Sequence, residues 1–388
     1  MRKQSGASGT AGAHFWAGIL GLVGLCWTSA GFSQDSTGLD LSTAYDRAVA
    51  SMDTGKFDEG LAIVDKVIAE YAEDALEDYG PVFGHFYFIR GMLLIRKQEY
   101  RSAIEALKTC YETYDNEILK QSVQGDHRLP NRFRIQALEQ WAGCEMAMGE
   151  FAAAGERYQR VLKEDDQKYE PRINRLQVQI NLAKCFIQSG KVTQGREFLE
   201  KQLDSETLTE PTKRMVFMVL VNNWAPKAST PEVRNFLSRY GDLIRNEELL
   251  SRRSRNGAFA ARAGAAFKAN DPLRALLWYG MMGHPGQILE LYQRRIIELE
   301  ARVVEEDIKA QVEARIAELK GEIPGLRKEY VSMQLGIGGA HYQLESLAGS
   351  RSAYLLLARE FPEIEQLGEP ESLGRGQRVC DHLFPRVS

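Results

Sequence analysis

The sequence contains little proline, little cysteine and no surplus of basic residues. Twelve prolines in 388 residues exclude a collagen-like or Pro-rich linker protein. The five cysteines include no C-x-x-C pair, so a thioredoxin-like centre, a zinc ribbon and a disulfide-dense scaffold are excluded. With 49 Lys and Arg against 53 Asp and Glu, the chain also lacks the basic surface that a general nucleic-acid binder needs for phosphate contacts.

Motifs that carry chemistry are missing as well. No histidine belongs to an H-E-x-x-H motif, and neither a G-x-S-x-G elbow nor a G-x-x-x-x-G-K-[ST] phosphate loop occurs. Cys380 and His382 are two candidate ligands on a short tail, which is too few for a metal site. We therefore predict a protein that is not an enzyme and that binds no cofactor and no metal. An enzyme whose site is built from scattered residues is the competing interpretation.

The N-terminus has the features of an export signal. A basic start precedes an uncharged apolar run from Phe15 to Trp27, about 13 residues, which is shorter than the ~20 residues of a membrane-spanning helix. Small residues follow and allow cleavage after Ser33 or after Ala30. We interpret residues 1–33 as a signal peptide, so the mature chain would reach the periplasm without a transmembrane segment. An uncleaved amphipathic helix is the alternative.

The body of the chain repeats a short pattern. Each occurrence has a turn and then an anchor residue, with one small residue three positions after the anchor and another nine positions before it. The anchors are Phe57, Tyr100, Phe151, Val192 and Pro272. The small residues form the pairs Ala48 and Gly60, Gly91 and Ala103, Ala142 and Ala154, Ala183 and Gly195, and Ala263 and Ala275. Small side chains on both sides of a turn allow two antiparallel helices to approach to ~8–10 Å.

This pattern resembles the tetratricopeptide repeat (TPR), in the long-repeat form of bacterial periplasmic TPR-like proteins. The likeness covers residues 41–285 and a further pair at 331–362, with units roughly 40–50 residues apart where the family has about 34. A unit anchored at Pro231 has Asn222 and Arg234 at the small places, so we expect it to pack differently. The resemblance implies an all-α superhelical solenoid of antiparallel helix pairs.

Residues 286–330 break this rhythm with dense mixed charge. Between Gln287 and Lys320 there is neither glycine nor proline. Apolar residues recur at steps of three and four in two runs, first at Tyr292, Ile296, Leu299 and Val303, and later at Val312, Ile316, Leu319 and Ile323. The stripe predicts one long, coiled-coil-like helix near the C-terminus, interrupted at Gly321 and Pro324 and packed on the end of the array. A helical arm that holds a homo-oligomer together is the alternative.

A pair of cysteines and a cluster of arginines are further candidates, the first for a disulfide and the second for a docking patch. Cys144 and Cys185 hold equivalent places in neighbouring repeats, where helix spacing would keep them farther apart than a disulfide allows, so we predict buried packing residues. The densest basic cluster is either a solvated helix face or a docking patch for an acidic partner or lipid head group. It consists of Arg252, Arg253, Arg255 and Arg262.

The TPR resemblance also implies a function. In that family the first helix of each pair lines a concave surface that suits an extended peptide or a partner helix. The groove-facing positions fall on Tyr45, Phe88, Met92, Arg96, Glu139, Met146, Lys184, Gln188 and Lys268. We predict an exported, non-enzymatic scaffold that binds another protein, a component of a cell-envelope assembly. The alternative is a structural oligomer or spacer assembled through the 287–320 helix. The sequence leaves open whether the end of the 363–388 tail, from Leu367 to Ser388, fills the groove.

Overall fold

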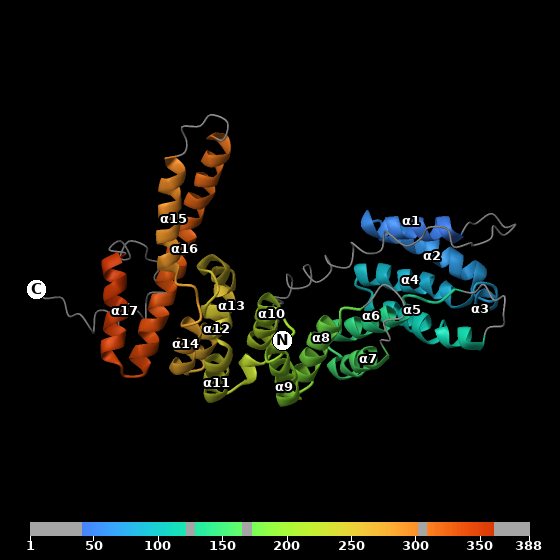
Figure 1. The fold of residues 1–388 in the computed structure, drawn as a ribbon, viewed down its shortest axis with the longest axis horizontal. Helices are drawn as coiled ribbons and strands as arrows, with labels where there is room; N and C mark the ends of the chain where they lie inside the picture. The colour runs from blue at the N-terminus through green and yellow to red at the C-terminus, as the bar shows by residue number, and fades with distance from the viewer. Residues whose placement is uncertain (1–40, 122–128, 165–172, 302–308, 361–388) are drawn as a thin grey trace, which may run out of the picture. The chain divides into compact units, whose positions relative to one another are not determined.

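The structure, a computed structural model, is built from helices. It describes four stretches of the chain, which are residues 41–121, 129–164, 173–301 and 309–360. Every regular element in these stretches is a helix, which confirms the expected all-α class (Figure 1). In the same stretches no helix is both long enough and apolar enough to span a bilayer. The chain divides into two compact units, Met1–Glu197 and Phe198–Ser388.

The first unit is a series of helix pairs. Its helices are α1 (Leu41–Asp53), α2 (Phe57–Tyr71), α4 (Gly84–Arg96), α5 (Tyr100–Glu112), α6 (Arg134–Ala147), α7 (Phe151–Glu164), α8 (Arg175–Gln188) and the start of α9 (Val192–Leu203). Shorter turns of helix are α3 (Ala75–Asp78), η2 (Gly80–Phe83) and η3 (Asn116–Gln121). Within pairs, α1 packs on α2, α4 on α5 and α6 on α7, and successive pairs meet through α2 and α4, α5 and α6, and α7 and α8. Consecutive helices therefore pack in pairs, as the repeat pattern predicted.

Small residues stand where the paired helices cross, as the repeat pattern predicted. A Cβ atom added to Gly91 would lie 2.6 Å from Leu107 Cγ, and one added to Gly195 would lie 2.7 Å from the carbonyl oxygen of Ala183. The alanines at the equivalent places are fully buried, namely Ala48, Ala103, Ala142, Ala154, Ala183, Ala263 and Ala275. Larger residues there would force the helices apart.

The turn inside each of these pairs contains one residue with a positive φ. Gly55, Gly149 and Gly190 have φ values of 74°, 82° and 93°, and Gln98 and Asn270 adopt the same region at 63° and 59°. Each stands two residues before its anchor. A left-handed residue ends the first helix and reverses the chain, and glycine is the residue that does so without steric cost.

The second unit contains the remaining helices. They are α10 (Glu210–Asn223), η4 (Ala225–Lys227), α11 (Thr230–Tyr240), α12 (Asp242–Arg245), α13 (Leu249–Lys268), α14 (Pro272–Tyr279), α15 (Pro285–Glu300), α16 (Lys309–Gln343) and α17 (Leu347–Glu360). The helices α13 and α14 form one pair, and α16 and α17 form the predicted C-terminal pair. In addition, α11 packs on α14, and α14 packs on α16.

The unit anchored at Pro231 packs through large side chains. Phe217 of α10 stacks on Phe236 of α11 with ring centroids 4.9 Å apart, and Trp224 meets Phe236 edge-on at 5.2 Å. Because this unit lacks small residues at the crossing, aromatic rings hold its helices together. It therefore differs from the other pairs, as its sequence predicted.

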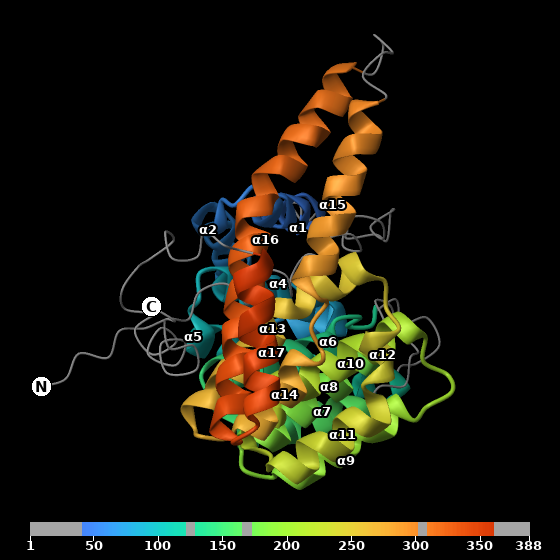
Figure 2. The ribbon, with the colours of Figure 1, turned by 90° about the vertical axis from the view of Figure 1, so that its left-hand side faces the viewer.

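The charged segment forms two helices, so the prediction of a single helix over 287–320 is wrong. The helices α15 and α16 pack side by side as a hairpin, whose far end projects beyond α13 and α14 (Figure 1 and Figure 2). Lys320 Nζ of α16 lies 2.8 Å from Glu300 Oε1 of α15. The predicted stripe is buried between them at Tyr292, Ile296, Leu299, Val312, Ile316 and Leu319. An apolar stripe needs only an apolar partner surface, and its own second half supplies one.

The helix α16 continues through Pro324, where the sequence predicted an interruption. A proline inside a helix costs about 3 kcal/mol. Here the helix is buried on both sides of it, at Leu319 before and at Leu326 and Tyr330 after, and this packing offsets the lost hydrogen bond. The predicted signal at 1–33 and the tail at 363–388 lie outside the described residues.

Candidate protein-binding groove

The nine residues predicted to line a groove differ in their exposure. Tyr45 and Met92 are only 3% and 6% exposed, so both side chains belong to the core. Phe88 is half-buried and stacks face to face on Phe133, with ring centroids 4.6 Å apart. The stacking brings α4 next to the start of α6, as expected for first helices of neighbouring pairs.

The other six predicted residues are at least partly exposed. They are Arg96, Glu139, Met146, Lys184, Gln188 and Lys268. Burial lowers the pKa of Lys184. Lys268 belongs to the second unit, whereas the other five belong to the first. A single surface that joins all of them stays a prediction.

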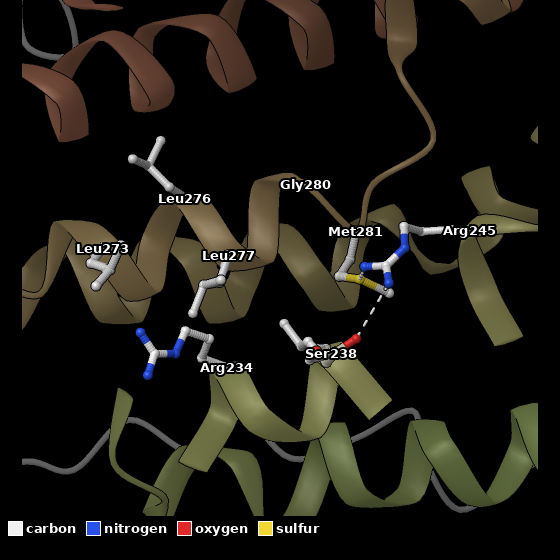
Figure 3. Close-up of a pocket in the computed structure, with 9 residues that line it drawn as sticks. Arg234, Ser238, Arg245, Leu273, Leu276, Leu277, Gly280 and Met281 are labelled. Carbon is white, nitrogen blue, oxygen red and sulfur yellow. Dashed lines mark hydrogen bonds between the residues drawn. The ribbon is translucent and has the colours of Figure 1, made fainter. Parts of the chain in front are cut away.

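The second unit contains a groove that the sequence did not predict. It lies between α11, α12 and α14 and has a volume of about 460 Å³ (Figure 3). Its apolar side is formed by Leu273, Leu276 and Leu277 of α14 and by Met281 just beyond that helix. Leu273 is 45% exposed, so an apolar surface faces solvent here.

The groove exists because α14 is apolar on two faces. Ala275 and Trp278 are fully buried on one face of the helix. Asp271 caps its N-terminus by accepting a hydrogen bond from the Arg274 backbone nitrogen at 3.1 Å, and Pro272 occupies the first turn. The second apolar face is the signal in the sequence that would have indicated the groove, because a helix that is apolar all round needs cover on every side.

Two arginines border the groove. Arg234 lies beside Leu273 and Leu277, and Arg245 lies beside Met281 (Figure 3). Arg245 pairs with Asp242 at 2.9 Å and approaches the Met281 sulfur at 3.7 Å. Arg234 has no carboxylate partner among the residues that the structure describes. The groove therefore combines an apolar floor with an uncompensated positive charge.

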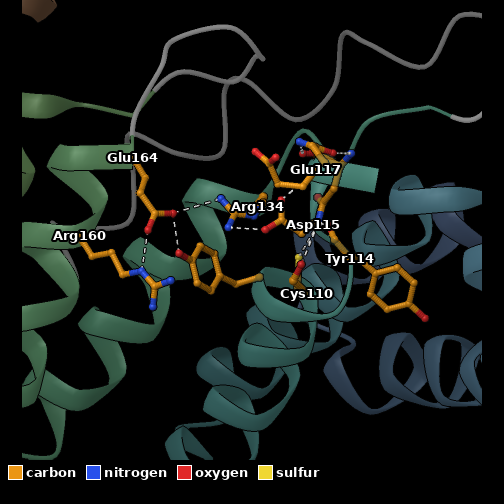
Figure 4. A network of polar contacts seen from close by, with 10 residues as sticks. Cys110, Tyr114, Asp115, Glu117, Arg134, Arg160 and Glu164 are labelled. Carbon is orange, nitrogen blue, oxygen red and sulfur yellow. Dashed lines mark hydrogen bonds and ion pairs between the residues drawn. The ribbon is translucent and has the colours of Figure 1, made fainter. Parts of the chain in front are cut away.

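A polar network in the first unit is a structural brace (Figure 4). The Tyr111 hydroxyl donates to Glu164 Oε2 at 2.6 Å, and Arg160 Nε donates to Glu164 Oε1 at 2.6 Å. Arg134 binds Glu164 at 3.2 Å and Asp115 at 2.8 Å. Although burial opposes it, hydrogen bonding from Tyr111 and Arg160 lowers the pKa of Glu164. These bonds tie α5, α6 and α7 together and pair each charge with its opposite.

Asn131 anchors the start of α6 beside this network. Its side-chain nitrogen donates to the carbonyl oxygens of Cys110 at 2.9 Å and Tyr114 at 3.1 Å, and the residue is 1% exposed. Next to it, the Arg132 backbone nitrogen donates to His85 Nε2 at 3.1 Å. Burial, together with the charge of Arg132, lowers the pKa of His85 to about 3, so this imidazole is neutral.

The three cysteines in the described residues are buried thiols. Burial raises the pKa of Cys110, Cys144 and Cys185 to about 12 in each case. Such thiols stay protonated and do not react as nucleophiles. The prediction that Cys144 and Cys185 are packing residues is confirmed. Within the described stretches no group of three or more His, Cys, Asp or Glu side chains is placed to hold a metal ion.

The predicted arginine cluster binds mostly to its own chain. Arg252 donates to the Met282 carbonyl oxygen at 2.8 Å, Arg253 pairs with Glu322 of α16, and Arg255 also has a carboxylate partner. These bonds hold α13 in the second unit, and carboxylates compensate the charges of Arg253 and Arg255.

Comparison with known proteins adds a distant likeness to solved structures. No protein-family model and no curated protein matches this chain. A solved structure from Podospora anserina, described as a kinesin light chain with nearly identical TPR-like repeats, is 18% identical. The match covers 52% of this chain and 93% of that one, with a TM-score of 0.41.

Proposed function

We propose that this protein is an exported, non-enzymatic scaffold that binds another protein, a component of a cell-envelope assembly. Helix-pair repeats present long surfaces to protein partners, which supports a binding role. The observation that carries the proposal is the exposed apolar surface of α14 with Arg234 at its border. Such a surface suits a segment of a partner that combines apolar side chains with carboxylates.

Site-specific photo-crosslinking tests the binding role. A photoreactive residue at Ser238, which lines the groove and is exposed, should capture a stoichiometric envelope protein in the native host. Capture should be lost when Leu277→Ser or Arg234→Glu is added. It should survive Lys328→Glu, a matched charge change on an exposed face of α16. Capture that is unaffected by all three substitutions would exclude the groove as the binding site.

Sequencing the N-terminus of the mature protein tests export. The proposal expects a chain that begins at Gln34, or at Gly31 if cleavage follows Ala30, and that is recovered from the periplasmic fraction. Recovery of a chain that still begins with Met1 in the cytoplasm would contradict this part of the proposal.

The alternative of an oligomer held together by the 287–320 segment loses the apolar stripe on which it was based. The stripe that a second copy would need is buried between α15 and α16 of the same chain. Ile297, which is 67% exposed, points away from that stripe and is a single apolar residue among charged neighbours.

A further inference from the structure

We propose that an acidic segment of the protein's own tail, residues 363–373, binds in the groove between α11, α12 and α14. The segment reads Glu-Ile-Glu-Gln-Leu-Gly-Glu-Pro-Glu-Ser-Leu, with four glutamates and no basic residue. Its apolar side chains, Ile364, Leu367 and Leu373, alternate with the carboxylates. This inference goes beyond the proposed function, because the occupant is the chain itself.

The groove and the segment are complementary in chemistry. The groove offers the exposed Leu273 beside the half-buried Leu277, and Arg234 there has no carboxylate partner among the described residues. Covering the exposed surface of Leu273 would contribute about 25 cal/mol of binding free energy for each Å² of apolar surface buried. A segment with leucines between glutamates covers that surface and pairs the arginine at the same time. Carboxylate–guanidinium pairs are also the stronger, charge-assisted kind of hydrogen bond.

The tail starts close to one end of the groove. Glu360, the last described residue, hydrogen-bonds the Tyr330 hydroxyl, whose pKa is raised by burial and by this carboxylate. The Tyr330 ring lies 5.1 Å from the ring of His284. His284 follows Met281, which closes the groove beside Arg245, by three residues along the chain. The route from the end of α17 to the groove is therefore short.

The length of the segment is sufficient to cover the groove. Thirteen residues from 361 to 373 reach about 43–47 Å when extended, at about 3.3–3.6 Å for each residue. The helix α14 has 8 residues, and at 1.5 Å for each it is about 12 Å long. A chain entering beside Met281 meets Arg245 first, so Glu365 lies there. Glu369 and Glu371 then reach Arg234, with Leu367 between them over the leucines of α14.

A segment tethered to the same chain competes strongly with a separate partner for the groove. Short tethers give effective concentrations in the millimolar range. A partner that uses the same groove must therefore displace the tail, and the apolar surface of α14 stays covered until it does.

Disulfide trapping in the mature chain, with Cys380→Ser as background, tests this inference. Cysteines at Ser238 and Leu367 should form an intrachain disulfide under mild oxidation at least about tenfold faster than cysteines at Ser332 and Leu367, as expected for a local concentration raised by docking. Ser332 is exposed on α16, two residues from Tyr330, so it lies near the origin of the tail and outside the groove. Equal rates for the two pairs would overturn the inference.

A charge swap sharpens the test. Arg234→Glu should slow trapping at Ser238, and adding Glu369→Arg with Glu371→Arg should restore it. Arg234 is exposed, so these variants are expected to fold, and circular dichroism checks that they do. Slow trapping in the swapped chain would also overturn the inference. If Ser238 captures an envelope partner but never Leu367, the proposed function stands and the tail inference falls. If Leu367 is trapped at Ser238 and no partner is captured there, the tail inference stands and the proposed function falls.

Discussion

His85 is a buried imidazole that the fold keeps neutral. In the unfolded chain the same side chain takes up a proton near pH 6.5, whereas in the folded chain its pKa is about 3. Between these values the unfolded state binds more protons than the folded state. The free energy of unfolding therefore falls as the pH drops below about 6.5, and it keeps falling toward pH 3.

Replacing His85 by glutamine should remove this part of the pH dependence. Gln can accept the same hydrogen bond from the Arg132 backbone without taking up a proton. We expect the slope of unfolding free energy against pH below about pH 6 to decrease by up to about 1.4 kcal/mol for each pH unit. Urea denaturation of both chains at several pH values measures the slope, and identical slopes would show that His85 does not titrate on unfolding.

Glycines in the first unit differ in how much room surrounds them. A Cβ at Gly195 would lie 2.7 Å from a backbone carbonyl oxygen, which cannot move without shifting α8, whereas a Cβ at Gly155 would meet Cys185 Cβ at an ordinary 3.5 Å. We expect Gly195→Ala to destabilise by about 1–3 kcal/mol. Gly155→Ala should stabilise by up to about 1 kcal/mol, because alanine is the better helix former. Thermal unfolding of the two variants compares them directly, and equal effects would refute the close crossing of α8 and α9.

At the scale of elements, the turns inside the helix pairs all use the left-handed region, but not all use glycine. We expect Gln98→Gly to stabilise by about 0.5–1 kcal/mol, since a side chain in that region costs about 1–2 kcal/mol and glycine recovers about half of it. Gly149→Ala should cost about 1–2 kcal/mol, although no atom lies within 4 Å of the added Cβ. Chemical denaturation measures both, and a neutral Gly149→Ala would mean that the turn relaxes.

The turns and crossings were also the part of the fold that the sequence predicted best. Small residues and left-handed turns are local requirements, so they leave a local mark at each pair. The hairpin of α15 and α16 has no such local sequence signal. Its stripe has the same spacing whether it faces another chain, the end of the array or its own second half, and only the packed structure decides among these partners. The helix through Pro324 was missed because tertiary packing offset a local cost.

The hairpin gives a prediction about assembly. Leu319→Ala should cost about 2–5 kcal/mol locally, because Leu319 is buried in the seam, and should speed amide hydrogen exchange in α15 and α16. The molecular mass in solution should not change, since the seam lies within one chain. Light scattering measures the mass. A fall in mass with Leu319→Ala, but not with Lys328→Glu, would restore the oligomer interpretation.

At the scale of the whole molecule, the site was harder to predict than the fold. Sequence positions indicated which helices come first in each pair, but Tyr45 and Met92 turned out to be buried, because groove and core positions are adjacent on a helix. The leucines of α14 were missed for a related reason. Whether a second apolar face is covered depends on elements such as α11 and α12, which lie tens of residues away along the chain.

The three buried cysteines of the first unit can report how often its helix pairs open. Cys110, Cys144 and Cys185 lie on α5, α6 and α8, which belong to three successive helix pairs, and each is shielded from solvent. A thiol-labelling reagent can reach each one only during the moments when its helix pair opens. In a chain with Cys380→Ser, mass spectrometry of each labelled peptide would then time the opening of the array pair by pair, under native conditions and without any added probe.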